Sequence, residues 1–438
     1  MMSPSLDSLF LSLLRPHPDL AAQQAALAQL SAADGDALVA KAVDQAVVGL
    51  VYQSLQALPA GTVPTAVLTP LRAASQRAAR FNLALVKELT TILAALNNAA
   101  IPVIVLKGAY LAQAIYPQLH LRQMGDLDLL VPKERVEEAY TLLQTLDYNY
   151  YDDNSSMVDL EDRPLEIKIN LNEGHHLTPL YKDPGLPLVE LHWTLCDPEE
   201  ARGFDLAAVW QRAQPASFLG AAALVLAPED LILHLCHHAA YHHQFDMGLR
   251  GLMDISRVVH RFGPQIDWGA LQRTAEDWGW QRGVYLTLAL THAMFDLSLP
   301  APIAQLVEAI VPSPDFVYHT QALMLQPKAA HRAYTNQIKS AESYRALQEL
   351  TPIQRLGLSL RQIFPPPQRM AQIYSISPSY LSPALYRHYW RRLNAYQVAK
   401  ARLIADRRRD RQRWQQTEVA QPGISRHKTD LHHWLTAP

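Results

Sequence analysis

Two aspartates interrupt an apolar run in the sequence DLDLLV, residues 126–131. A short apolar run that ends at a proline is typical of a β-strand. Residues i and i+2 of a strand point to one face, so Asp126 and Asp128 share a face, and Leu127 and Leu129 share the other. Burial and mutual repulsion both disfavour two adjacent carboxylates. The aspartate face must therefore meet water or a cation, while the leucine face packs into a core.

Strand and helix patterns alternate on both sides of this run. IPVIVLKG at 101–108 predicts a strand that ends in a turn at Gly108, and KERVEEAYTLLQTLDY at 133–148 predicts an amphipathic helix. Further strands are predicted at 165–172, 175–182 and 186–195. Strands interleaved with helices and followed by antiparallel strands predict an α+β fold with a small mixed sheet.

The rest of the chain is predicted to be helical, and 438 residues are enough for two or three domains. We predict an N-terminal helical region at 1–98 and an α/β sheet domain at 99–219. A helical domain follows at 220–362. The last segment, 363–438, is predicted to be a Pro-rich linker and a basic C-terminal helix. The sheet domain is thus flanked by helical domains on both sides.

Composition and charge narrow the class of protein. Hydrophobic residues make up 49% and charged residues 18%, as in ordinary globular proteins, and the net charge of -2 excludes a uniformly basic nucleic-acid-binding surface. Cys196 and Cys236 form neither a disulfide framework nor a zinc motif, which favours a reducing compartment. No apolar run reaches the ~18 residues of a membrane span, and the N-terminus lacks a basic signal-peptide region. We expect a cytoplasmic protein without membrane insertion.

Carboxylates on one strand face suit a hard divalent cation, because Mg²⁺ prefers oxygen ligands. The spacing alone is a weak signal, since Asp34 and Asp36 repeat it in AADGDAL without a strand context. Asp126 and Asp128 have that context. Downstream, LVELHW supplies Glu190 as a third carboxylate in another predicted strand.

Three polar groups near these carboxylates are candidates for substrate binding. The Lys107-Gly108 turn leads from a strand into a helix, where free N–H groups and close backbone approach favour phosphate. Arg122 lies four residues before Asp126 and offers a fork to phosphate oxygens. His192 shares its strand face with Glu190, as a substrate contact or as a structural partner.

Taken together, three motifs identify a family that the chain resembles. They are VLKGAYLAQAIYP at 105–117, LRQMGDLDLLV at 121–131 and LVELHW at 188–193. The combination resembles the polymerase-β-like nucleotidyltransferase superfamily, and within it a bacterial family of uncharacterised nucleotidyltransferases. APEDLILHLCHHAAYHH at 227–243 and RGLMDISRVV at 250–259 are similar to the helical half of that family. The resemblance covers roughly residues 30 to 300.

The resemblance implies a catalytic site and a reaction. Asp126, Asp128 and Glu190 would be the catalytic residues and would bind two Mg²⁺ or Mn²⁺ ions, with Lys107-Gly108 as the phosphate turn. The implied activity is a metal-dependent transfer of NMP from an NTP such as ATP to an unknown acceptor hydroxyl or phosphate. The acceptor could be a small molecule, a peptide or RNA.

One departure from the family pattern leaves other functions open. The superfamily more usually has Gly-Ser or Gly-Gly about ten residues before the aspartates. Here Gly108 precedes Ala109 and lies eighteen residues before Asp126. One alternative is therefore a catalytically weak nucleotide-binding protein, and another is a toxin-like enzyme that modifies tRNA or protein.

A histidine cluster follows at 234–243. His234, His238 and His242 recur at every fourth position, and His237 and His243 are adjacent to them. This pattern is compatible with a zinc site, with a helix face that lines the nucleotide cleft, or with ordinary packing.

Two further patterns also leave alternatives open. Arg250 and Asp254 lie one helical turn apart, as an ion pair within the helix or as contacts to the sheet domain. The segment Arg387–Arg413 contains ten Lys or Arg against two Asp, with interspersed aromatic residues. It is either a solvated helix face or a surface for an acidic partner such as a nucleic acid.

Overall fold

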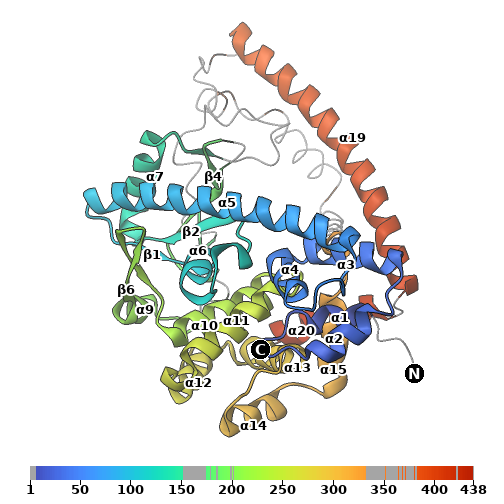
Figure 1. The fold of residues 1–438 in the computed structure, drawn as a ribbon. Helices are drawn as coiled ribbons and strands as arrows, with labels where there is room; N and C mark the ends of the chain where they lie inside the picture. The colour runs from blue at the N-terminus through green and yellow to red at the C-terminus, as the bar shows by residue number, and fades with distance from the viewer. Residues whose placement is uncertain are drawn as a thin grey trace.

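The computed structural model of the 438-residue chain combines helices with a seven-stranded sheet in the part that it describes (Figure 1). It describes residues 6–150, 174–177, 179–183, 186–197, 200, 202–331, 382–420 and 423–437, with isolated positions at 351, 364, 367, 370 and 379. The predicted strand at 165–172 and most of the predicted Pro-rich linker lie outside these residues. The α+β prediction is confirmed.

The sheet has the strand order β3-β4-β5-β2-β1-β7-β6. Its strands are β1 (Ile104–Val105), β2 (Asp126–Leu130), β3 (Asn149–Tyr150), β4 (Leu180–Tyr181), β5 (Leu188–His192), β6 (Gln214–Phe218) and β7 (Ala221–Val225). β2 runs parallel to β5 and antiparallel to β1, and β1 runs parallel to β7. The remaining pairs are antiparallel, so the sheet is mixed as predicted.

The register of β2 and β5 sorts their side chains into two faces. Asp128 pairs with Glu190, and each residue of β2 has one partner on β5. Leu127 and Leu129 of β2 are fully buried with Val189 of β5 in a core that also contains side chains of α5 (Thr65–Asn98) and α7 (Val136–Thr145). Helix packing on this face therefore directs the acidic residues to the opposite face.

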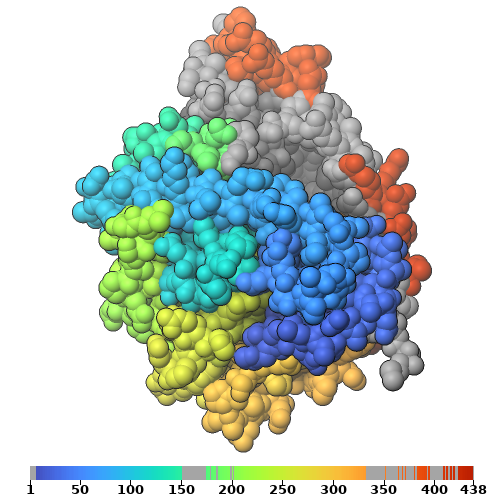
Figure 2. Space-filling model, viewed as in Figure 1, coloured from blue at the N-terminus to red at the C-terminus, as the bar shows by residue number. Residues whose placement is uncertain are grey.

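The N-terminal region is helical, as predicted. Its helices are α1 (Leu6–Ser12), α2 (Leu20–Leu27), α3 (Ala32–Asp44), α4 (Val48–Gln56) and α5. Ser31 caps α3 in a capping box with Asp34, which explains where this helix begins. The predicted stripe on α5 is confirmed, since Leu85, Leu89 and Ile92 are fully buried. Figure 2 shows α5 as a band that crosses the visible face of the molecule, next to the N-terminal helices.

Short helical segments lie between the strands of the sheet region. They are α6 (Lys107–Tyr110), η1 (Leu111–Ile115), η2 (Leu119–Leu121) and η3 (Lys133–Arg135).

The second half of the described chain is mostly helical. The later helices are α9 (Leu206–Arg212), α10 (Pro228–His237), η6 (His238–His242), α11 (Arg250–Phe262), η7 (Gly263–Gln265), α12 (Trp268–Asp277), α13 (Gln281–Phe295), α14 (Ala301–Ile310), α15 (Pro314–Met324), α19 (Pro383–Ala420) and α20 (Ile424–Thr436). The predicted basic C-terminal helix is α19, which runs along one edge of the molecule (Figure 1). Among the described residues, no helix is both long and apolar enough for a membrane span.

Two apolar clusters hold these elements together. One cluster joins the sheet face under α5 and α7, and the other joins the N-terminal helices to α10, α11 and α13. The hairpin β6–β7 was not predicted, and it extends the sheet beside β1. The domain boundaries at 98, 219 and 362 stay predictions.

Candidate active site

The acidic face of the sheet borders a cavity of about 190 Å³. Asp126 and Asp128 of β2 and Glu190 of β5 all line it. Lys107, Gly108 and Arg122 line the same cavity, so it gathers six of the seven residues predicted for the site.

His192 connects two of the carboxylates. Its Nε2 lies 3.1 Å from Oδ1 of Asp128 and 3.5 Å from Oε2 of Glu190. The ring is almost fully buried, and it approaches Asp128 from the neighbouring strand because β2 and β5 run parallel in register. The predicted shared face of Glu190 and His192 is thus confirmed.

Lys107 reaches the same aspartate from the turn after β1. Its Nζ lies 3.3 Å from Oδ1 of Asp128, and both side chains are largely buried. The backbone of Lys107 has φ of +38°, a left-handed conformation that costs a non-glycine residue about 1–3 kcal/mol. The charge pair with Asp128 offsets part of this cost, and it fixes the turn against β2.

The pKa values of the two aspartates are shifted in opposite directions. Burial, followed by the nearby charge of Asp128, raises the pKa of Asp126 to about 6. Burial also opposes ionisation of Asp128, but the Lys107 ammonium and the hydrogen bond from His192 outweigh it and hold the pKa of Asp128 well below its ordinary value. Burial disfavours a charged His192, whereas hydrogen bonds to Asp128 and Glu190 raise its pKa above the ordinary value. Asp128 therefore ionises more readily than Asp126.

Arg122 forms a buried ion pair across the cavity. Its Nε and Nη2 lie 3.3 and 2.9 Å from the two carboxylate oxygens of Asp254 on α11, and the Tyr116 hydroxyl donates to Asp254 over 2.8 Å. Gly108 makes room for this guanidinium, because a Cβ there would lie 2.5 Å from Nη1 of Arg122. Of the two alternatives for Asp254, an ion pair within its helix or a contact to the sheet domain, the structure shows the contact to the sheet domain.

One comparison with known proteins identifies the family. The family described as "Uncharacterised nucleotidyltransferase" matches residues 31–296, more than half of the chain. The chain belongs to this nucleotidyltransferase family. Neither curated proteins nor solved structures gave a match. Family membership confirms the resemblance to uncharacterised nucleotidyltransferases, and it supports a nucleotidyltransferase activity.

Two residues that the sequence did not single out for the site hold the segment before β2, residues 119–125, which we call the aspartate loop. Asn82 of α5 is fully buried and donates to the carbonyl oxygens of Leu119 and Arg122 over 2.7 and 2.9 Å. Its side-chain oxygen accepts from the backbone N–H of Met124 over 3.2 Å. Arg250, known from the sequence only as a partner for Asp254, lines the cavity and donates to the carbonyl oxygen of Gln123 over 3.1 Å.

Part of the histidine cluster lines the cavity of this family member. His238, His242 and His243 are among the lining residues. His234 and His237 are buried behind them, and Nε2 of His237 lies 3.0 Å from Oε2 of Glu200. Cleft lining therefore applies to three of the five histidines and packing to the other two.

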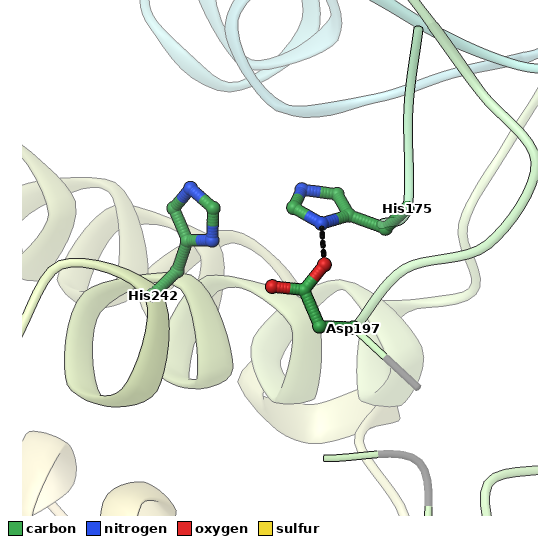
Figure 3. A group of neighbouring side chains, drawn as sticks. All are labelled: His175, Asp197 and His242. Atoms are coloured by element: carbon green, nitrogen blue, oxygen red, sulfur yellow. Dashed lines mark hydrogen bonds and ion pairs between the residues drawn. The ribbon is translucent and has the colours of Figure 1, made fainter. Parts of the chain in front are cut away.

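Two groups of side chains in the described residues could hold a metal ion. One consists of Asp128, Glu190 and His192, whose ligand atoms lie within 4.8 Å of one another. The other consists of His175, Asp197 and His242, with ligand atoms within the same distance (Figure 3). The zinc alternative for His234, His238 and His242 is not supported, because among the described residues these three do not form such a group and only His242 takes part in one. Burial lowers the pKa of His175 to about 3, so this ring is neutral at pH 7.

Proposed function

We propose that this chain is a metal-dependent nucleotidyltransferase that transfers NMP from an NTP to an acceptor hydroxyl or phosphate. The observation that carries the proposal is the convergence of Asp126, Asp128 and Glu190 on one cavity from two parallel strands in register. Membership of a nucleotidyltransferase family supports the reaction class.

The side chains around this cavity fit Mg²⁺ or Mn²⁺. Asp126, Asp128 and Glu190 would hold the ions, and oxygen donors are the ligands that these hard cations prefer. The close approach of Lys107 and His192 to Asp128 supports this assignment, because a carboxylate that attracts cationic partners can also attract a metal cation. When bound, the metal would neutralise charge on the triphosphate and polarise its phosphoryl oxygen.

The chain's own residues would position the substrate. Arg250 and Lys107 place cationic side chains on the cavity wall, where they would attract the phosphates. Asp126 needs to lose its proton to bind a metal, so binding should weaken as the pH falls below the pKa of about 6. The Arg122–Asp254 pair would hold Gly108 and the aspartate loop at a fixed separation.

A labelling experiment tests the reaction. The full chain would be incubated with α-³²P-labelled NTPs, Mg²⁺ or Mn²⁺, and fractions of cell extract separated into small molecules, RNA and protein. We expect pyrophosphate release and transfer of label to one fraction, and loss of both in the Asp126→Asn plus Asp128→Asn variant. Equal labelling by wild type and this variant would reject the proposal.

The chain contains its own matched control. Asp34 and Asp36 have the same spacing but lie at the start of α3, away from the cavity. Substituting both by Asn should leave labelling unchanged. Calorimetry could instead show metal-dependent NTP binding while no fraction gives pyrophosphate release. That result would reject catalysis and favour the alternative of a catalytically weak nucleotide-binding protein.

A further inference from the structure

We propose that His175, Asp197 and His242 form a second metal site, which takes a borderline divalent transition metal such as Zn²⁺. The three side chains point toward one another (Figure 3), and two of them, His175 and His242, line the cavity. Nδ1 of His175 lies 2.6 Å from Oδ1 of Asp197, and all three ligand atoms lie within 4.8 Å of one another. The imidazole rings of His175 and His242 meet edge to face with centroids 4.9 Å apart.

The three ligands come from separate parts of the fold. The segment at 174–177 is held against β5, because Trp193 donates to the carbonyl oxygen of His175 over 3.1 Å and Leu177 donates to that of Leu191 over 2.9 Å. Asp197 lies in the loop after β5, and His242 ends η6. A metal ion here would tie the end of β5 to the helical half of the chain.

The donor set differs from that of the aspartate site. Two imidazole nitrogens and one carboxylate oxygen suit Zn²⁺ and related metals, whereas the aspartate site offers mostly carboxylate oxygens, from Asp126, Asp128 and Glu190, together with the single imidazole of His192. His242 is exposed and the side chain of Asp197 is 41% exposed, so a fourth position would face solvent. Three protein ligands with one open position are typical of zinc sites that bind water or a substrate.

A small adjustment would bring the ligands to bonding distance. Ligand atoms around tetrahedral zinc lie about 3.4 Å apart, given bonds of roughly 2.1 Å. The 2.6 Å contact between His175 and Asp197 must open, and the proton on Nδ1 of His175 must move to Nε2. His242 must move inward, which its exposed position permits.

Metal titration of the full, untagged chain tests this site without using its activity, so its failure would leave the nucleotidyltransferase proposal standing. The protein would be stripped with a chelator and titrated with Zn²⁺ against a colorimetric competitor. We expect one equivalent to bind, and His242→Gln to weaken binding by more than about tenfold. Co²⁺ titrated in place of Zn²⁺ should give the visible absorption of a four-coordinate site with nitrogen ligands.

Two control variants separate the alternatives. His243→Gln removes the next residue, which also lines the cavity but does not belong to the group, and should bind zinc as wild type does. Asp126→Asn plus Asp128→Asn should also retain zinc. Unchanged affinity in His242→Gln, or zinc loss only in the double aspartate variant, would overturn the proposal. Circular dichroism of the metal-free His242→Gln protein checks that the fold is intact.

Discussion

Replacing Asp254 by alanine is expected to destabilise the protein by about 3–5 kcal/mol, because it leaves a buried guanidinium without its counter-charge. The side chains of Arg122 and Asp254 are only 7% and 2% exposed, so solvent compensates little for the lost carboxylate. Two hydrogen bonds from Arg122 are lost, and the hydroxyl of Tyr116 loses its acceptor. The expected loss in free energy of unfolding is therefore that of a broken buried ion pair, which is larger than that of a surface pair.

Urea denaturation at pH 7, followed by circular dichroism, measures this loss directly. The double variant Arg122→Met plus Asp254→Leu removes both charges, so it should be less destabilised than Asp254→Ala alone. Glu138→Ala serves as a surface control, since the Arg135–Glu138 pair is solvent-exposed and its loss should change little. A destabilisation by Asp254→Ala below about 1 kcal/mol would refute the reasoning, because exposed pairs have that magnitude.

Three further substitutions test the site. Asp126→Asn should stabilise the protein by about 1–3 kcal/mol above pH 6, because a pKa raised from 3.8 to about 6 means that folding disfavours the ionised carboxylate. This gain should disappear as the pH falls toward 4, where the carboxyl group of the wild type is protonated in the folded protein. A gain that does not vary with pH in urea denaturation would contradict this. Gly108→Ala should cost about 1–3 kcal/mol in the same assay, since the added Cβ meets the Arg122 guanidinium at 2.5 Å, and wild-type stability would show that the guanidinium moves freely. Asn82→Ala should cost about 2–4 kcal/mol and speed hydrogen exchange at the amide of Met124, whereas unchanged exchange would show that the loop does not depend on Asn82.

The positions of the acidic residues on their strands could be predicted from the sequence. The alternation of leucines with Asp126 and Asp128 determined which residues face the core, and the structure buries Leu127 and Leu129 as expected. The pairing of Asp128 with Glu190 could not follow from local pattern, because 62 residues separate them in the chain. The motif LVELHW placed Glu190 in a second predicted strand as a third carboxylate, and the resemblance to a family implied the same role, but neither gave the register of this strand with β2.

The hairpin β6–β7 was missed because its local signals conflict. Its residues, QPASF and AAALV, are poor in β-branched and aromatic side chains, so they do not favour a strand. The turn has positive φ at Leu219 and Gly220, of which only the glycine is a usual turn residue. Here strand pairing with β1 overrides the local preference.

Asn82 and His175 were missed for different reasons. A single asparagine within a long helix gives no sequence signal, and its role depends on a loop some forty residues away. His175 lies 67 residues before His242, so only the fold brings the two rings together. The spacing of the histidines on α10 and η6 indicated a helical stripe, but not which of them would meet ligands from the sheet.

The cavity lies at a junction, and its shape therefore depends on how the two halves pack. The sheet supplies the carboxylates, while α11 supplies Arg250 and Asp254 and η6 supplies His242. Leu130 of β2 belongs to the same apolar cluster as side chains of α10 and α11, so one core links the strand that carries the aspartates to the helices that line the cavity. Because the ion pair between Arg122 and Asp254 crosses this junction, a change that loosens it should widen the gap between the carboxylates and Arg250. Substrate positioning and folding stability are thus coupled through the same buried contacts.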